Sequence, residues 1–136
     1  MSNPIDRLEK DVLQLLLQSD DPVLGILRRQ LELARRKPRE LSGVGFFTEF
    51  DVPIDAPRIP GNASIRFGDV VAELEGLAHG VGFLLFVDSG VLTMLEAYTF
   101  DEPWPQTIGR YDVKYTSGNV RDLDALRQTP GWPALI

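Results

Sequence analysis

Hydrophobic residues recur at helical spacing through the first 39 residues of the chain. Asn3-Pro4 and Asp21-Pro22 each place a capping residue directly before a proline, which is typical of a helix start. The apolar positions that follow repeat every three or four residues: Ile5, Leu8, Val12, Leu15 and Leu16 in the first segment, then Val23, Leu24, Leu27, Leu31 and Ala34 in the second. Pro38 ends the second stripe, and the short connection predicts an antiparallel pair of helices.

Beyond residue 42 the period changes from helical to alternating. Apolar and polar positions alternate over residues 43–52, which is typical of a strand with one buried face. Three further strands and a fifth, edge strand are expected, in this order: 67–75, 81–87, 91–100 and 110–116. Asn119 is expected to cap a short last helix over 120–128, before a proline-containing tail.

These elements predict a single α+β domain over residues 1–136, with a helical pair at 1–39, a sheet at 40–116, and a C-terminal helix and tail at 117–136. Two N-terminal helices are expected to pack on one face of a four- to five-stranded, mainly antiparallel sheet. The hydrophobic content of 43% is enough for one core of this kind.

The register of the two central hairpins decides what each sheet face carries. If Gly76 pairs with Gly80 and Asp88 pairs with Val91, one face is free of charge and is expected to lie under the helices. That covered face would hold Val70, Ala72, Leu74, Gly82, Leu84, Phe86, Val91, Thr93, Leu95 and Ala97. The opposite face would hold Val71, Glu73, Glu75, Val81, Phe83, Leu85, Leu92, Met94, Glu96 and Tyr98, extended by Phe47, Glu49 and Asp51. A slip of one residue at the second turn would bury Glu96 without a partner, which is costly, so we adopt this register.

Composition narrows the chemistry that the chain can support. The absence of cysteine excludes disulfides, thiolate catalysis and cysteine-based metal sites, and His79 is the single histidine, so neither a metal nor a cofactor is expected. The N-terminus has no signal-peptide pattern, and the longest uncharged stretch, residues 76–87, is too short to cross a bilayer. We therefore expect a cytoplasmic protein that does not contact a membrane.

Charge is distributed unevenly along the chain. The net charge is −6, with eight Lys/Arg against six Asp/Glu over residues 1–39 and six against fourteen over 40–136. The larger, acidic part repels nucleic acid and attracts basic partners, so no nucleic-acid binding is expected. The basic cluster at the end of the second predicted helix is expected to be solvated, and it comprises Arg28, Arg29, Arg35, Arg36, Lys37 and Arg39.

The acidic sheet face is the main candidate for function, because it mixes carboxylates with large apolar side chains. Its candidate binding residues are Glu49, Glu73, Glu75, Phe83, Met94, Glu96 and Tyr98. We interpret this face as a surface for a protein partner, with a basic partner favoured by charge. Three alternatives stay open: a solvated face covered by the loops at 53–64 and 101–110, a homo-oligomer interface, and an enzyme. In the enzyme, Glu73 and Glu96 would flank Phe83 with Cα atoms roughly 10 Å apart and act as acid and base.

Four segments together resemble a family of small bacterial α+β proteins of uncharacterised function: Ala72-Glu73-Leu74-Glu75-Gly76, Gly80-Val81-Gly82-Phe83-Leu84-Leu85-Phe86, Met94-Leu95-Glu96-Ala97-Tyr98-Thr99 and Glu102-Pro103-Trp104-Pro105. The resemblance covers about residues 41–105. More loosely, the chain is similar to the small acidic proteins that serve as immunity partners of bacterial toxins. Those proteins bind a toxin and carry no catalysis, so the similarity implies protein binding without implying particular site residues.

Overall fold

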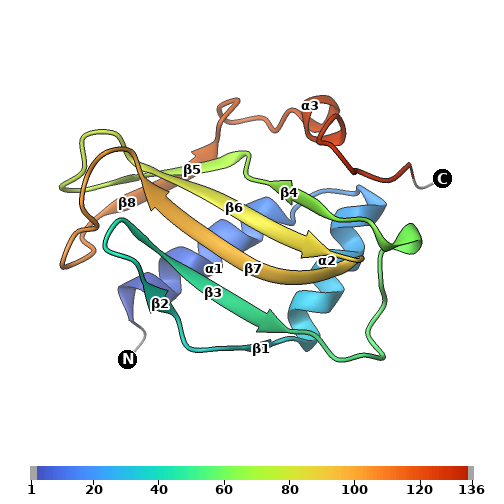
Figure 1. The fold of residues 1–136 in the computed structure, drawn as a ribbon. Helices are drawn as coiled ribbons and strands as arrows, with labels where there is room; N and C mark the ends of the chain where they lie inside the picture. Colours follow the sequence, from blue (N-terminus) through green and yellow to red (C-terminus); the bar gives the residue numbers. More distant parts are fainter. Residues whose placement is uncertain (1–2, 135–136) are drawn as a thin grey trace.

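The computed structural model describes residues 3–134, which form three α-helices and an eight-stranded antiparallel sheet (Figure 1). The helices are α1 (Pro4–Leu16), α2 (Pro22–Leu33) and α3 (Leu123–Arg127). The strands are β1 (Arg35–Arg36), β2 (Glu40–Leu41), β3 (Gly45–Asp51), β4 (Ile65–Phe67), β5 (Val70–Leu74), β6 (Val81–Asp88), β7 (Val91–Thr99) and β8 (Tyr111–Tyr115). The predicted α+β class, the two N-terminal helices and the short C-terminal helix are confirmed, whereas the sheet has more strands than predicted.

The additional strands are β1 and β2, which both pair with β3, and β4, which is separated from β5 by a break and pairs with β6 as β5 does. The strand order is β1-β3-β7-β6-β5-β8, with β2 also paired to β3 and β4 also paired to β6. Between β4 and β5 the break falls at Gly68, where a Cβ atom would lie 1.7 Å from the carbonyl oxygen of Phe83. Only glycine fits so close to a neighbouring backbone, and the alternation of a sequence does not reveal such a break.

The predicted starts of α1 and α2 are confirmed in atomic detail, whereas α3 is capped by Asp122, which accepts the Ala125 N–H at 3.0 Å, and not by Asn119 as predicted. The side chain of Asn3 accepts a hydrogen bond from the Ile5 N–H, and that of Asp21 accepts one from the Val23 N–H, each at 2.9 Å. A proline follows each cap, where its missing N–H has no consequence for the helix. Local sequence therefore determines where both helices begin.

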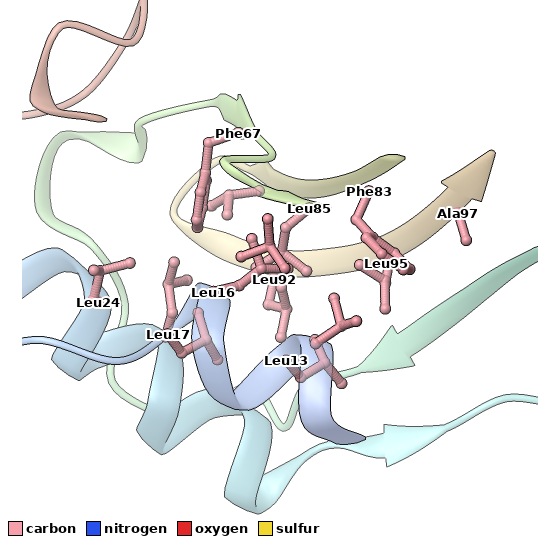
Figure 2. Close-up of a cluster of buried hydrophobic side chains, with 14 of the residues drawn as sticks. Leu13, Leu16, Leu17, Leu24, Phe67, Phe83, Leu85, Leu92, Leu95 and Ala97 are labelled. Carbon is pink, nitrogen blue, oxygen red and sulfur yellow. The ribbon is translucent and has the colours of Figure 1, made fainter. Parts of the chain in front are cut away.

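The hydrophobic core lies between the helical pair and one face of the sheet. Figure 2 shows leucines of the α1 and α2 region, including Leu16 and Leu24, directed toward sheet residues such as Leu85 and Leu95. All four of these side chains are fully buried. Burial of apolar side chains on this scale is the main stabilising contribution in a domain of this size.

The predicted register is wrong for β6, and with it the predicted position of Phe83. Val71 pairs with Gly82. The predicted register would pair Val71 with Leu85, so β6 is shifted by three residues relative to the prediction. An odd offset reverses the face of a strand. The side chain of Phe83 is 0% exposed and packs in the core, whereas Leu84 and Phe86 point to the other side of the sheet. Phe83 is therefore not available to a partner.

A β-bulge in β7 compensates for the reversed faces of β6, so that most of β7 keeps its predicted faces. The second hairpin starts as predicted, with Asp88 opposite Val91, but Phe86 then pairs with Met94, so that Thr93 is an extra residue. The Thr93 hydroxyl donates a hydrogen bond to the Phe86 carbonyl oxygen at 3.1 Å. The bulge allows Leu92 to point into the core while Glu96 stays on the opposite face.

A buried glutamine fastens α2 to the far end of the β6–β7 hairpin. The Gln30 amide nitrogen donates to the carbonyl oxygens of Pro57 at 2.8 Å and Gly90 at 2.9 Å, and its amide oxygen accepts the Leu92 N–H at 2.8 Å. Ile59, in the same loop as Pro57, is almost fully buried. The loop at 53–64 is therefore held against the helix side of the sheet.

Tyr111 connects the edge strand β8 to α1 and makes the stability of the fold depend on pH in the alkaline range. Its hydroxyl donates a hydrogen bond to an Asp11 carboxylate oxygen at 2.6 Å. Burial, together with the Asp11 hydrogen bond and charge, raises the pKa of Tyr111 from 10.0 to about 12. In the unfolded chain the phenol titrates near its ordinary value, so the stability that this group contributes is complete below pH 10 and is lost as the pH rises toward about 12.

We expect Tyr111→Phe to flatten the pH dependence of unfolding in that interval. The check is urea denaturation at a series of alkaline pH values, combined with tyrosinate absorbance, in which one tyrosine of the wild type should ionise near pH 12. An unchanged alkaline stability profile in the variant would contradict the assignment.

Candidate functional site

The face of the sheet that points away from α1 and α2 is the candidate functional site, and we call it the open face. In Figure 1 the strands stand in front, α1 and α2 lie behind them, and α3 lies beyond β4 at the edge. The outward side chains of the open face are Phe47 and Glu49 from β3, Met94, Glu96 and Tyr98 from β7, Leu84 and Phe86 from β6, Arg66 from β4, Val71 and Glu73 from β5, and Asp112 and Lys114 from β8.

Neither of the two loops that were candidates for covering this face does so. The loop at 53–64 packs against α2, as the Gln30 hydrogen bonds show. In the loop at 101–110, the Trp104 ring packs edge-on against the buried Phe46 ring, with centroids 5.5 Å apart. Both loops are therefore anchored on the core side, and the open face keeps half-buried apolar side chains at its surface.

Five of the seven predicted site residues lie on the open face: Glu49, Glu73, Met94, Glu96 and Tyr98. Glu75 lies just beyond the end of β5, is exposed, and pairs with Arg110 at 3.1 Å. Phe83 lies in the core, as described above. The sequence interpretation missed Leu84 and Phe86, because the reversed register of β6 assigned both to the covered face.

Glu96 has an unusual position among the carboxylates of the open face. It lies on β7 between Phe47 of β3 and Leu84 of β6, directly opposite each in the antiparallel register, with Met94 and Tyr98 on either side along its own strand. The residue is half-buried. Among residues 3–134 no cationic group lies within ion-pair distance of its carboxylate, which also accepts no hydrogen bond from a described residue.

The neighbouring carboxylates already have cationic partners. Lys37 lies 3.6 Å from Glu49, and the Lys114 ammonium lies 2.8 Å from Glu73. The Lys114 hydrogen bond and charge hold the pKa of Glu73 below its usual value, and the same contact raises the pKa of Lys114. Glu96 is therefore the carboxylate without a cationic partner that lies among the large apolar side chains of this face, whereas Asp112, which also forms no ion pair with a described residue, lies exposed on the edge strand β8.

An aromatic strip extends from Glu96 toward the end of the sheet. The Tyr98 ring lies across Gly82 of the neighbouring strand, where a Cβ atom would come within 2.5 Å of the ring. Phe100 packs edge-on against Tyr98, with ring centroids 5.5 Å apart, and is 43% exposed. Glycine at position 82 thus lets the Tyr98 ring lie flat on the sheet, where it presents a broad apolar surface.

A groove borders the open face on the other side of Leu84. It has a volume of about 470 Å³ and runs between the sheet and α3, with Gly68 and Leu84 on the sheet side and Ala125 and Leu126 on the helix side. The guanidinium of Arg66 at its rim lies over the Phe86 ring, 5.3 Å from the centroid. The groove gives the otherwise flat face a concave apolar border.

The proposed carboxylate pair of an enzyme is not assembled. In the observed register Glu73 is level with Gly80 and Glu96 is opposite Leu84, so their Cα atoms lie about 16 Å apart, from strand rise and spacing. An inverting pair needs carboxyl groups about 6.5–9.5 Å apart, with one pKa raised. The pKa of Glu73 is instead lowered by Lys114.

Another groove lies at the β5–β8 corner, and four of the charged side chains that line it form two ion pairs with one another, whereas Asp112 forms none with a described residue. It measures about 670 Å³ and includes His79, the Glu73–Lys114 pair and the Glu75–Arg110 pair. The Glu102 carboxylate accepts the N–H groups of Ala78 and His79, at 2.8 and 2.9 Å, and these bonds lower the pKa of Glu102. Most charged groups of this groove therefore already have partners within the chain, in contrast to the carboxylate of Glu96.

Within the described range 3–134, no three side chains of His, Asp or Glu converge as metal ligands, and no helix is long and apolar enough to cross a membrane. Comparison with protein-family models, with curated proteins and with solved structures finds no match for this chain. The site is therefore interpreted from the chemistry of the chain itself.

Proposed function

We propose that this chain is a non-catalytic protein-binding domain whose open face contacts a basic protein partner. The observation that carries the proposal is a sheet face, uncovered by helix or loop within residues 3–134, on which large apolar side chains surround a carboxylate without a cationic partner. Contiguous apolar surface with a polar rim is typical of protein interfaces. Aromatic residues such as Tyr98 and Phe47 are enriched in the centres of such interfaces.

Charge favours a basic partner over a second copy of the chain. Residues 40–136 carry six Lys/Arg against fourteen Asp/Glu, so two open faces would bring like charges together. A basic surface would be attracted at long range and would associate faster at low salt. Inhibition of a toxin, in the manner of an immunity protein, is one role that this chemistry fits, and the loose similarity of the chain to such proteins supports it.

The test is selection from a phage-displayed library of random peptides, used as the probe for what the open face binds. Phe86→Thr with Met94→Thr removes a directly opposed apolar pair from the centre of the face, while threonine suits an exposed strand position. We expect selected peptides to bind the wild type at least about tenfold more tightly than this double variant, since side chains at interface centres commonly contribute that much.

Ile54→Ser is the matched control, because Ile54 is 92% exposed but lies in the loop at 53–64, away from the open face. Peptide affinity should be the same for this variant and the wild type. For both proteins, the affinity should fall as the salt concentration is raised, because salt screens the attraction between opposite charges. Peptides that bind the double variant as well as the wild type would refute the proposal, as would a selection that yields no binder.

A further inference from the structure

Two arginines of this chain share one arrangement, in which a guanidinium bonds to a carboxylate and lies over an aromatic ring. Arg39 bonds to Glu9 at 3.2 and 3.3 Å and lies 5.3 Å from the centroid of the Phe46 ring. Arg121 bonds to both oxygens of Asp69, at 2.7 and 2.9 Å, and lies 5.0 Å from the centroid of the Tyr115 ring. A planar guanidinium can do both at once, because its edge binds the carboxylate while its face stacks on the ring.

The surroundings of Glu96 reproduce this arrangement with the arginine missing. The carboxylate lies directly opposite Phe47 and two residues from Tyr98 on its own strand. A cross-strand neighbour such as Phe47 lies about 5 Å away at Cβ, and a residue two positions along the strand such as Tyr98 lies about 7 Å away, so both rings are within reach of a group bound to Glu96. The nearest arginine on the open face, Arg66, is directed over Phe86 instead.

We propose that Glu96, between Phe47 and Tyr98, takes up an arginine side chain of the partner. This inference rests on the proposed function and specifies which residue of a basic partner the open face recognises. Arginine is favoured over lysine because an ammonium group is more strongly hydrated and cannot form two parallel hydrogen bonds while stacking. Apolar residues beside the arginine would contact Leu84 and the groove along α3.

The experiment uses three capped tripeptides as probes and follows the backbone amide signals of the whole chain by nuclear magnetic resonance. The first is acetyl-Leu-Arg-Leu-amide, the second replaces arginine by the neutral and nearly isosteric citrulline, and the third replaces it by lysine. We expect the arginine probe to shift the amides of Phe47, Leu84 and Glu96 and to bind about five- to tenfold more tightly than either of the others, as a partly desolvated ion pair with stacking would give.

Glu96→Gln should remove the difference between the arginine and citrulline probes, because it deletes the charge and keeps the shape. The matched control is Glu32→Gln, which makes the same change at an exposed carboxylate of α2 paired with Arg29. This control should leave all three affinities within about twofold of the wild type.

The possible failures separate this inference from the function on which it rests. Equal affinity for the arginine and citrulline probes, with shifts on the open face, would overturn the arginine site and leave the binding face in place. A lysine probe that matches arginine would overturn the arginine preference. Shifts confined to other parts of the chain would also overturn the site, while the peptide selection described above decides independently whether the open face binds at all.

Discussion

Arg121→Ala should lower the free energy of unfolding by about 3–5 kcal/mol, since it breaks a buried ion pair and exposes a helix end at the same time. The Arg121 side chain is only 6% exposed and forms two hydrogen bonds with Asp69. It also donates to the carbonyl oxygens of Leu15, Leu16 and Gln18, at 3.2, 2.8 and 2.7 Å. These carbonyls lie at the C-terminal end of α1 or just beyond it, where a cation is favourable both as a donor and for the helix dipole. The Leu15 carbonyl also accepts the Gln18 N–H and the Tyr115 hydroxyl.

Urea denaturation measures this loss of unfolding free energy, and comparison with two further variants shows which contacts cause it. Arg121→Lys keeps the charge but cannot reach Asp69 and three carbonyls together, so an intermediate loss is expected. Arg110→Ala is the control: its side chain is 95% exposed and pairs with the exposed Glu75, so stability should change by less than about 1 kcal/mol. If Arg121→Ala were no more destabilising than Arg110→Ala, the role assigned to Arg121 in joining α1 to the sheet would be wrong.

Glu9→Ala should be the next most destabilising of these changes, with an expected loss of about 2–4 kcal/mol. Glu9 lies on α1 with its side chain 0% exposed, and its carboxylate binds Arg36, Arg39 and the Thr48 hydroxyl, the last at 2.7 Å. Removal of the carboxylate leaves Arg39, whose side chain is 14% exposed, with the half-exposed Asp6 as its one remaining carboxylate partner among the described residues. The loss is expected to be smaller than for Arg121 because Arg36 is 43% exposed and regains water.

Glu9→Gln distinguishes charge from hydrogen bonding at this site. The amide can still accept the Thr48 hydroxyl and one guanidinium N–H, so about half of the loss should be recovered. Thermal and urea unfolding of both variants measure the difference, with Arg29→Ala as a control that removes an exposed pair on α2. Equal stability of Glu9→Ala and the wild type would show that the contact between α1 and the β1–β2 segment contributes nothing.

The basic cluster predicted at the end of the second helix is exposed at five of its six positions, as expected, and only Arg39 is half-buried, but several of its arginines also have partners in the fold. Arg36 and Arg39 bind the buried carboxylate of Glu9, and Arg39 also binds Asp6 at 2.6 Å. Arg28, earlier in the cluster, donates to the carbonyl oxygens of Leu17 and Ser19 beyond the end of α1. Charge statistics at helix ends do not identify such partners, because the partners lie far away in sequence.

The alternation of apolar and polar residues predicts only some of the residues on the open face. Alternation in β7 correctly assigned Met94, Glu96 and Tyr98 to one face, because a charged residue at the central position distinguishes the two sides. The same reasoning failed for Phe83, because both faces of β6 are apolar and alternation carries no information there. The isolation of Glu96 from other charges also depends on which strands are neighbours, which no local pattern reports.

The sequence by itself determined the elements whose signals are local. Asn3 and Asp21 before their prolines define where α1 and α2 begin, and helical periodicity defines their buried stripes, because neighbours three and four residues apart share a face. Alternation and glycine turns located the main strands for the same reason. Only the tertiary structure decided the Thr93 bulge, the inward turn of Phe83 and the partners of Arg121 and Glu9. Each of these depends on contacts between segments distant in the chain, where burial of the apolar surface as a whole and the pairing of buried charges outweigh any local preference.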